Sequence, residues 1–268
     1  MISPQASIHP NAQLGENVRV DPFAVIHENV VIGSGSHIMS HAVIMPFTRI
    51  GQNCSIHPGA VLGGIPQDLK FVGEETTVEI GDNTTVRECV TINRGTRDKY
   101  KTVVGSNCLI MAYAHIAHDC IVGNNVILAN SVQLAGHVEV GDYAILGGLA
   151  AANQFTRIGS HTYIGGQSAI RKDVPPYTKA AREPLAYMGI NIVGLQRRAF
   201  PQETIDTISK LYHLLYVGNH SITTGINMVK EQLPDGEVKS EILSFIEQSR
   251  AGIIKRYSKN GVDEDHSF

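Results

Sequence analysis

The chain has 268 residues, with 22 basic and 25 acidic side chains that give a formal net charge of −3 at neutral pH. This balance argues against general nucleic-acid binding, which needs a basic excess. The hydrophobic content of 43% argues against a mainly disordered chain. No apolar run reaches the roughly 18 residues of a membrane-spanning helix, and the N-terminus has no secretory signal. We therefore expect a cytoplasmic protein that is not an integral membrane protein.

From residue 8 onward the sequence repeats every six residues. Each hexad opens with an aliphatic residue, as at Ile8, Leu14 and Val20. Four positions later comes a small residue, most often Ala, Val, Ser, Thr or Cys. This register holds to Ile170, and its aliphatic position is lost only at Asp68, Glu74, Asp98 and Ala152. Neither a helical period nor simple alternation produces such a pattern.

A parallel β-helix of hexapeptides explains the repeat. The aliphatic residue points into a narrow prism, and the small residue lies near a corner where a larger group would clash. The motif resembles the left-handed β-helix of hexapeptide acyltransferases, in which three hexads of about 18 residues in all form one coil. On that basis the repeat predicts about nine coils and a prism roughly 45 Å long.

Two segments, 64–78 and 94–103, interrupt the hexads without shifting their register. We expect both to be loops that leave the prism, and long loops on a compact scaffold are often functional. The second loop has one acidic residue, Asp98, among four basic ones: Arg94, Arg97, Lys99 and Lys101. A solvated basic loop and a site for an anionic partner both remain open.

The repeat ends at Val174-Pro175-Pro176. Segment 200–216 then has apolar residues at helical spacing, and segments 221–233 and 237–256 have a similar pattern. We predict a mainly β protein with a β-helix domain at residues 1–175. A small C-terminal helical domain at residues 176–268 would cap the open end of the prism.

Coils of this length place chosen residues above one another. His118 would lie next to Gly136 and then Gln154, and Asp119 next to His137 and then Phe155. These residues should face outward near a corner. An imidazole is a natural general base near neutral pH, a carboxylate can orient it, and the bare N–H of a glycine can stabilise an oxyanion. Together these groups suit acyl transfer.

Two alternatives remain for the histidine cluster. Histidines on a prism can bind zinc, as in the γ-class carbonic anhydrases, but the spacing His115-x-x-His118 differs from the His-x4-His of that family. The cluster could also be purely structural. A second column stacks Gly148 under Gly166, which would leave either a smooth groove for an apolar chain or two ordinary turn glycines.

Residues 107–148 closely resemble the family of UDP-N-acetylglucosamine O-acyltransferases, which carry out the first step of lipid A synthesis. The likeness extends through QDLKFVGE, RECVTINRGT, DVPPY and NIVGLQRRAF. It implies transfer of an (R)-3-hydroxyacyl chain from acyl carrier protein to the 3-hydroxyl of UDP-N-acetylglucosamine. It also implies a homotrimer with sites between neighbouring prisms, and no metal or organic cofactor in the chemistry.

The same resemblance assigns roles to individual residues. His118 would be the general base, Asp119 its support and Gly136 the oxyanion donor. Gly148 and Gly166 would line the acyl groove. The remaining substrate-binding residues would hold the sugar, the phosphates, the nucleotide or the carrier arm, and they are Asp68, Lys70, His115, His137, Asn153, Gln154, Asn191, Arg197 and Arg198.

The chain departs from the family pattern at two positions. Asn153 stands where the family commonly has His, and Val193 where it commonly has Glu. Both belong to the nucleotide-sugar region, whereas the proposed base is unchanged. The alternative acceptor is therefore a modified UDP sugar, for example a 3-amino derivative. A non-catalytic scaffold is a third hypothesis.

Overall fold

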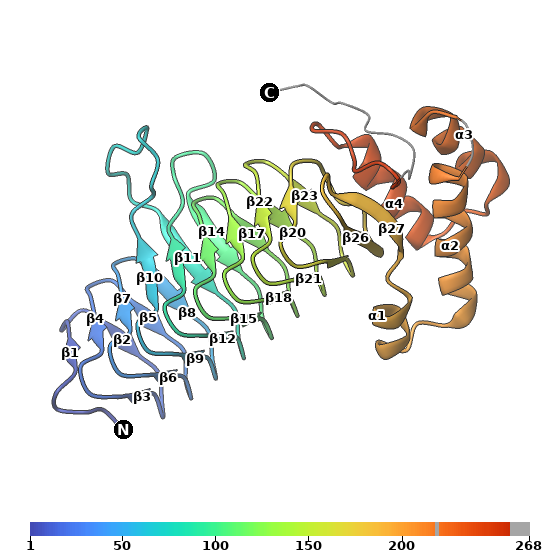
Figure 1. The fold of residues 1–268 in the computed structure, drawn as a ribbon. Helices are drawn as coiled ribbons and strands as arrows, with labels where there is room; N and C mark the ends of the chain where they lie inside the picture. Colours follow the sequence, from blue (N-terminus) through green and yellow to red (C-terminus); the bar gives the residue numbers. More distant parts are fainter. Residues whose placement is uncertain (218–219, 258–268) are drawn as a thin grey trace.

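Short parallel strands wind around a three-sided prism for about two thirds of the chain, and helices follow at its C-terminal end (Figure 1). This computed structural model describes residues 1–217 and 220–257. Ile116 pairs with Leu134, 18 residues further on, which confirms the predicted length of a coil. Consecutive strands belong to different sheets, so the chain passes through all three sheets in each turn.

The three sheets have nine, eight and ten strands. The first sheet consists of β1 (Ser7–Ile8), β4 (Val25–Ile26), β7 (Val43–Ile44), β10 (Val61–Gly64), β13 (Thr91–Asn93), β16 (His115–Ile116), β19 (Gln133–Leu134), β22 (Ala151–Ala152) and β25 (Ala169–Ile170). The second sheet consists of β2 (Gln13–Leu14), β5 (Val31–Ile32), β8 (Thr48–Ile50), β11 (Thr77–Ile80), β14 (Lys101–Val104), β17 (Ile121–Val122), β20 (Glu139–Val140) and β23 (Arg157–Ile158).

The third sheet completes the prism and continues beyond it. It consists of β3 (Arg19–Val20), β6 (His37–Ile38), β9 (Ser55–Ile56), β12 (Thr85–Val86), β15 (Leu109–Ile110), β18 (Ile127–Leu128), β21 (Ile145–Leu146), β24 (Tyr163–Ile164), β26 (Thr178–Ala181) and β27 (Ala186–Ile190). We call the edge between the first and second sheets the first corner, that between the second and third the second corner, and that between the third and first the third corner.

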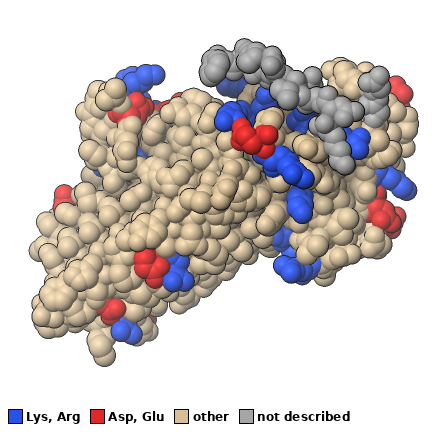
Figure 2. All heavy atoms as spheres, viewed as in Figure 1, with Lys and Arg blue, Asp and Glu red and all other residues tan. Residues whose placement is uncertain are grey.

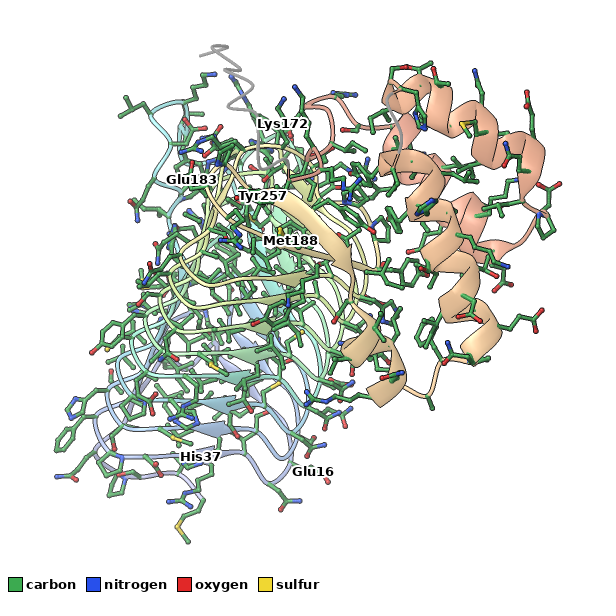
Figure 3. The ribbon with its side chains drawn as sticks, turned by 45° about the vertical axis from the view of Figure 1, so that its right-hand side comes forward. Glu16, His37, Lys172, Glu183, Met188 and Tyr257 are labelled. Atoms are coloured by element: carbon green, nitrogen blue, oxygen red, sulfur yellow. The ribbon has the colours of Figure 1, made fainter. Side chains whose placement is uncertain are left out.

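The aliphatic position of the hexads fills the inside of the prism. Ile38, Ile56, Ile92, Ile116 and Leu134 are all completely buried. In Figure 3 side chains occupy the space between the sheets along the whole prism. Large aliphatic groups therefore form one continuous apolar core, and burial of such groups is the main stabilising contribution to a fold of this kind.

The two interrupted segments are loops, as predicted. Strand pairing resumes after each of them, because Leu62 pairs with Ile92 and Ile80 with Val104. The strand ends place the loops at residues 65–76 and 94–100, and both project from the same edge of the prism (Figure 1). That edge is the first corner, so both loops lie beside the candidate site.

Beyond the repeat, the described residues form two further strands and four helices. β26 pairs in parallel with β24, and β27 pairs antiparallel with β26. The helices are α1 (Ile192–Arg197), α2 (Gln202–Tyr216), α3 (Ile222–Gln232) and α4 (Glu237–Glu247). The third sheet thus extends past residue 175, and the domain boundary at that residue stays a prediction.

The C-terminal region differs from the expectation in two respects. The sequence does not predict the short helix α1, which begins where the Asn191 side chain accepts a hydrogen bond from Gly194 N. The predicted helix at 237–256 ends at Glu247. The chain after it contacts the last coil of the prism, because Ile253 forms a bridge with Asp173 and Ile254 is buried in the prism core.

Candidate active site

A buried imidazole–carboxylate pair lies at the first corner, between β16 and β17. His118 and Asp119 are 5% and 0% exposed. The expectation that they face outward is therefore wrong with respect to solvent exposure, because both side chains are buried. They lie outside the aliphatic core, but loop 94–100 covers Asp119 and the next coil covers His118. Interruption of the hexads supplies that cover, which a regular coil would lack.

Four hydrogen bonds hold the Asp119 carboxylate. Thr96 N and Lys99 N donate to Oδ1 at 3.0 and 3.2 Å. Thr96 Oγ1 and His118 Nδ1 lie 2.7 and 2.8 Å from Oδ2. Burial alone would raise the pKa of Asp119, but these hydrogen bonds outweigh it and lower the pKa. An ionised carboxylate can only accept, so Nδ1 of His118 carries a proton, and in the neutral form of the ring Nε2 keeps a free lone pair.

Gly136 lies directly against the His118 ring. A Cβ at position 136 would come within 2.5 Å of Cε1 and 2.6 Å of Nε2 of that imidazole. Only glycine permits so close an approach. Among the residues that the structure describes, none accepts a hydrogen bond from the Gly136 N–H. The free lone pair of the base and an available backbone donor therefore lie side by side.

Two further imidazoles flank the pair. The His137 ring lies edge-on to His118, with centroids 5.1 Å apart, and stacks on Phe155 at 4.4 Å. His115 Nδ1 lies 2.7 Å from Thr91 Oγ1. Burial lowers the pKa of both His115 and His137, so both rings are neutral at pH 7. A neutral imidazole can donate one hydrogen bond and accept another, which suits a polar substrate.

A cavity of about 220 Å³ opens beside this cluster. The first loop contributes Asp68, Lys70 and Glu74, the second contributes Thr96, Arg97 and Asp98, and His137 and Phe155 complete the lining. The structure thus brings Asp68 and Lys70 to the edge of the histidine cluster, although they lie far from it in the sequence. Both interrupted segments contribute to one site.

Other predicted residues do not join this cavity. Asn153 and Gln154 lie exposed on the first corner. Gly148 and Gly166 stack on each other, since a Cβ on Gly166 would lie 3.0 Å from Gly148 O, but they occupy the third corner. A single chain therefore separates the expected acyl groove from the expected base.

The predicted nucleotide-binding residues lie at the second corner, where α1 packs against the prism. Asn191 Nδ2 donates to His161 O at 2.9 Å, and Arg198 Nη2 donates to Tyr143 O at 3.0 Å. Arg198 also lies over the Tyr143 ring, while Arg197 is exposed. The predicted site residues are thus distributed over all three corners.

The metal alternative fits the geometry less well than acid–base chemistry does. Ligand atoms of His118, Asp119 and His137 lie within 4.8 Å of one another. However, both Asp119 oxygens already accept hydrogen bonds, and the carboxylate binds His118 through Nδ1. His115 lies outside this group and contacts Thr91. A cation would have to displace the hydrogen bonds that organise the pair.

Sequence reasoning missed Thr96, although it donates twice to Asp119. The charged residues of that loop are its most conspicuous feature in the sequence. The signal available was the short interruption of the hexads, which places the loop one coil before His118 on the same corner. A polar residue there, next to a carboxylate on the following coil, is a candidate partner for it.

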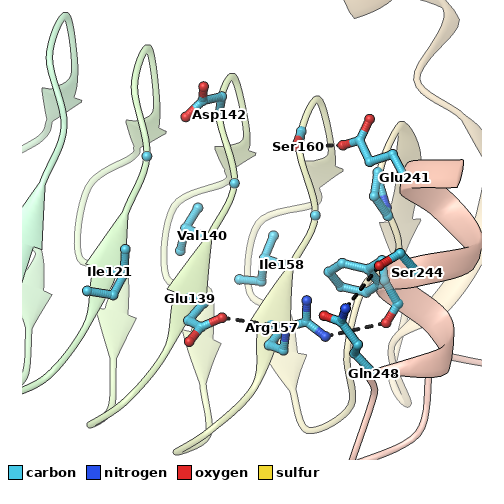
Figure 4. Close-up of a pocket in the computed structure, with 15 residues that line it drawn as sticks. Ile121, Glu139, Val140, Asp142, Arg157, Ile158, Ser160, Glu241, Ser244 and Gln248 are labelled. Carbon is cyan, nitrogen blue, oxygen red and sulfur yellow. Dashed lines mark hydrogen bonds and ion pairs between the residues drawn. The ribbon is translucent and has the colours of Figure 1, made fainter. Parts of the chain in front are cut away.

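The structure also contains a larger cavity, of about 450 Å³, between the second sheet and α4 (Figure 4). Several of its polar groups pair with one another. Arg157 lies 3.5 Å from Glu139 and donates to Phe245 O, and Ser160 donates to Glu241. These contacts join the helical region to the prism, and the sequence provides no indication of them.

Known proteins share both the repeat and the C-terminal region. A family profile described as bacterial transferase hexapeptide (six repeats) matches residues 29–64 and 101–136. The second domain of UDP-N-acetylglucosamine O-acyltransferases matches residues 173–254. The fold and the buried site therefore define a hexapeptide-repeat acyltransferase.

Individual relatives match over nearly the whole chain. The acyl-[acyl-carrier-protein]–UDP-N-acetylglucosamine O-acyltransferase of Chlorobaculum parvum is 52% identical over 94% of this chain and 96% of its own. The enzyme of that name from a Sulfurihydrogenibium species is 51% identical over 96% of each. The crystal structure of a UDP-N-acetylglucosamine acyltransferase from Bacteroides fragilis superposes with a TM-score of 0.93 at 47% identity, covering 95% of this chain and 100% of that one. The chain belongs to the family of acyl-carrier-protein-dependent UDP-N-acetylglucosamine O-acyltransferases.

Proposed function

We propose that this chain transfers an (R)-3-hydroxyacyl group from acyl carrier protein to the 3-hydroxyl of UDP-N-acetylglucosamine, with His118 as the general base. The observation that supports this best is the buried His118–Asp119 pair packed against Gly136. That arrangement places a base, its supporting carboxylate and an oxyanion donor within one small volume.

The steps follow from these groups. His118 Nε2 accepts the proton of the sugar hydroxyl as its oxygen attacks the thioester carbonyl carbon. The Gly136 N–H stabilises the negative oxygen of the tetrahedral intermediate. Collapse of the intermediate breaks the carbon–sulfur bond, and His118 returns its proton to the departing thiolate of the carrier. Asp119 stabilises the imidazolium between these two transfers.

The cavity beside His137 is the proposed sugar subsite. Asp68 and Lys70 line it and would hold the sugar and phosphates, and the neutral rings of His115 and His137 would contact the polar groups of the acceptor. A 3-amino UDP sugar is the second candidate, favoured by Asn153 and Val193. The mass of the product formed from each sugar distinguishes the two.

A homotrimer would unite the separated residues. Gly148 and Gly166 lie on the third corner, and Asn191, Arg197 and Arg198 on the second. A neighbouring prism could present its residues to the His118 of the first. The apolar glycine column would then receive the acyl chain beside the reacting carbonyl.

An acidic carrier protein would need exposed cations. Three of the six basic residues predicted for this role are engaged, since Lys99 pairs with Glu139, Lys101 with Glu79 and Arg198 with Tyr143 O. On the face seen in Figure 2, Lys and Arg side chains gather around the C-terminal end of the prism. Exposed Arg171, Lys179 and Arg182 belong to that end, where Figure 3 labels Lys172 and Glu183. Each of them also has a partner, since Arg171 pairs with Glu183 and Lys179 and Arg182 lie over the rings of Tyr163 and Tyr257, but their exposure leaves them accessible to the carrier.

We place the reaction in the cytoplasm. The described part of the chain holds no helix with the length and apolar character of a transmembrane span. All four cysteines are free, which suits a reducing compartment.

The test of the proposal replaces the base. His118→Asn keeps a polar group beside Asp119, and His118→Ala removes it. We expect either change to lower turnover about 10²–10⁴-fold, the usual effect of losing a general base. Turnover is measured by product mass with purified protein, hydroxyacyl carrier protein and UDP-N-acetylglucosamine. His27→Ala, a partly exposed histidine near the N-terminal end, is the control and should keep wild-type turnover. Normal turnover in a folded His118 variant would contradict the proposal.

A further inference from the structure

We infer that Thr96 is a positioning residue that sets how firmly Asp119 holds the His118 base. This inference rests on the proposed function of His118. Thr96 touches neither the reacting atoms nor the imidazole; it acts through the carboxylate. It belongs to loop 94–100, outside the strands that carry the catalytic pair.

The hydrogen bonds of Thr96 meet at one carboxylate. Its hydroxyl donates to Asp119 Oδ2 at 2.7 Å, the same oxygen that lies 2.8 Å from His118 Nδ1. Its backbone N–H donates to Oδ1 at 3.0 Å. Thr96 is only 7% exposed, so water cannot readily take the place of its hydroxyl. The hydroxyl of Thr96 has one proton, and it donates this proton to Asp119.

The loop that carries Thr96 is itself bound to loop 65–76, which lines the proposed sugar subsite. The Arg94 guanidinium lies 5.5 and 5.3 Å from the ring centroids of Phe47 and Phe71. Arg97 N donates to Glu74 Oε1 at 3.0 Å. Phe71 and Glu74 belong to the loop that carries Asp68 and Lys70. Thr96 therefore links the proposed sugar subsite to the carboxylate behind the base.

Loss of the Thr96 hydroxyl should change the charge that His118 experiences. With one donor fewer, the Asp119 carboxylate concentrates more negative charge on the oxygen facing His118, which favours the protonated imidazole. The other charged or titratable groups nearby stay in place: His137 Nε2 is 3.8 Å from Asp119 Oδ2, Asp98 faces His137, and His115 and Lys99 flank the pair. The acid limb of the rate profile should therefore move to higher pH.

The experiment compares Thr96→Val, Thr96→Ser and Thr84→Val. Valine keeps the shape and removes the hydroxyl, and serine restores it. Thr84 is a matched control, because it is completely buried and donates to Gly105 O at the second corner. For Thr96→Val we expect kcat to fall about tenfold or more, as for a lost hydrogen bond to a charged group. We expect a smaller change in KM for the sugar and a shift of the acid limb of kcat/KM to higher pH.

Thr96→Ser should recover the wild-type profile, and Thr84→Val should leave it unmoved even if stability falls. An unchanged profile in folded Thr96→Val, or an equal shift in Thr84→Val, would overturn the inference. If the valine variant does not fold, Thr96→Ala answers the same question. Normal turnover of His118→Asn would instead refute the proposed function. An inactive His118→Asn with an unmoved Thr96→Val profile refutes the inference alone.

Discussion

The contact between Gly136 and His118 shows how one missing side chain shapes the site. The ring of His118 occupies the space in which a Cβ at position 136 would lie. This contact holds the imidazole on one side, and its hydrogen bond to Asp119 holds it on the other. The position of Nε2 therefore depends on both neighbours, and a very small change at residue 136 should disturb it.

Gly136→Ala tests this dependence. The added Cβ would approach the imidazole to 2.5 Å, so the ring must turn away from Asp119 or the coil must shift. We expect turnover to fall at least about tenfold, since small misplacements of catalytic groups are costly. The midpoint temperature of thermal unfolding should change only slightly, in contrast to the fall in turnover. Gly236→Ala, where the Cβ meets open space, is the control. Full turnover in Gly136→Ala would show that the ring is not held this closely.

At the scale of elements, Glu241 of α4 binds the prism through two hydrogen bonds. Its Oε1 accepts a hydrogen bond from Ser160 Oγ at 3.0 Å, and its Oε2 accepts one from the Tyr177 hydroxyl. Burial and the neighbouring carboxylate raise the pKa of Tyr177, which keeps that hydroxyl protonated as a donor. Arg157 adds a stacking contact with Phe245 at 4.5 Å. One side chain thus joins a helix to two successive coils, and Figure 4 shows its contact with Ser160.

Glu241→Ala should therefore destabilise the protein while leaving the site at the first corner intact. It leaves Ser160 and the Tyr177 hydroxyl without their acceptor, which costs about 1–3 kcal/mol for a buried group. Urea unfolding measures the loss, and turnover at low temperature should stay near that of the wild type. Glu231→Ala, on the exposed side of α3, is the control and should change the unfolding free energy by less than about 0.5 kcal/mol. Equal stability of the two variants would contradict the role of Glu241.

At the scale of the whole molecule, the single prism does not bring all the expected residues together. His118 and the two loops occupy the first corner, α1 the second, and the stacked glycines the third. A prism is rigid along its axis, because every strand pairs with its neighbours in the coils on either side. No bending of one chain could bring three edges to one point, whereas a second copy could.

Subunit mixing tests this arrangement. His118→Ala and Arg198→Ala lie on different corners and should each be inactive alone. If sites form between subunits, mixed trimers regain intact sites, and equal mixing after unfolding and reassembly should restore about a quarter of wild-type activity. Light scattering should give about three times the chain mass of 29.0 kDa. A 29.0 kDa particle, or no recovery on mixing, would argue for a site within one chain.

Much of the fold could be read from periodicity. The six-residue spacing of aliphatic residues from Ile8 to Ile170 predicts the strands, their register and the two loops. It does so because every coil buries the same positions of the hexad in the prism. The end of the helix predicted at 237–256 could not be read in this way. Ile253 and Ile254 suit a helix locally, but Ile253 forms a bridge with Asp173 and Ile254 packs into the prism core. Contacts between residues so far apart in the sequence produce no periodic pattern.

The same distinction between periodic spacing and long-range contacts applies to the site. The sequence by itself determined that His118 stacks on Gly136 and that Asp119 precedes His137 on one corner, since a regular repeat converts spacing into position. Only the tertiary structure decided that the pair is buried, that Thr96 binds the carboxylate, and that Asp68 and Lys70 reach the same cavity. These groups belong to the loops that leave the repeat. Their position depends on contacts such as Arg94 with Phe71, which no period encodes.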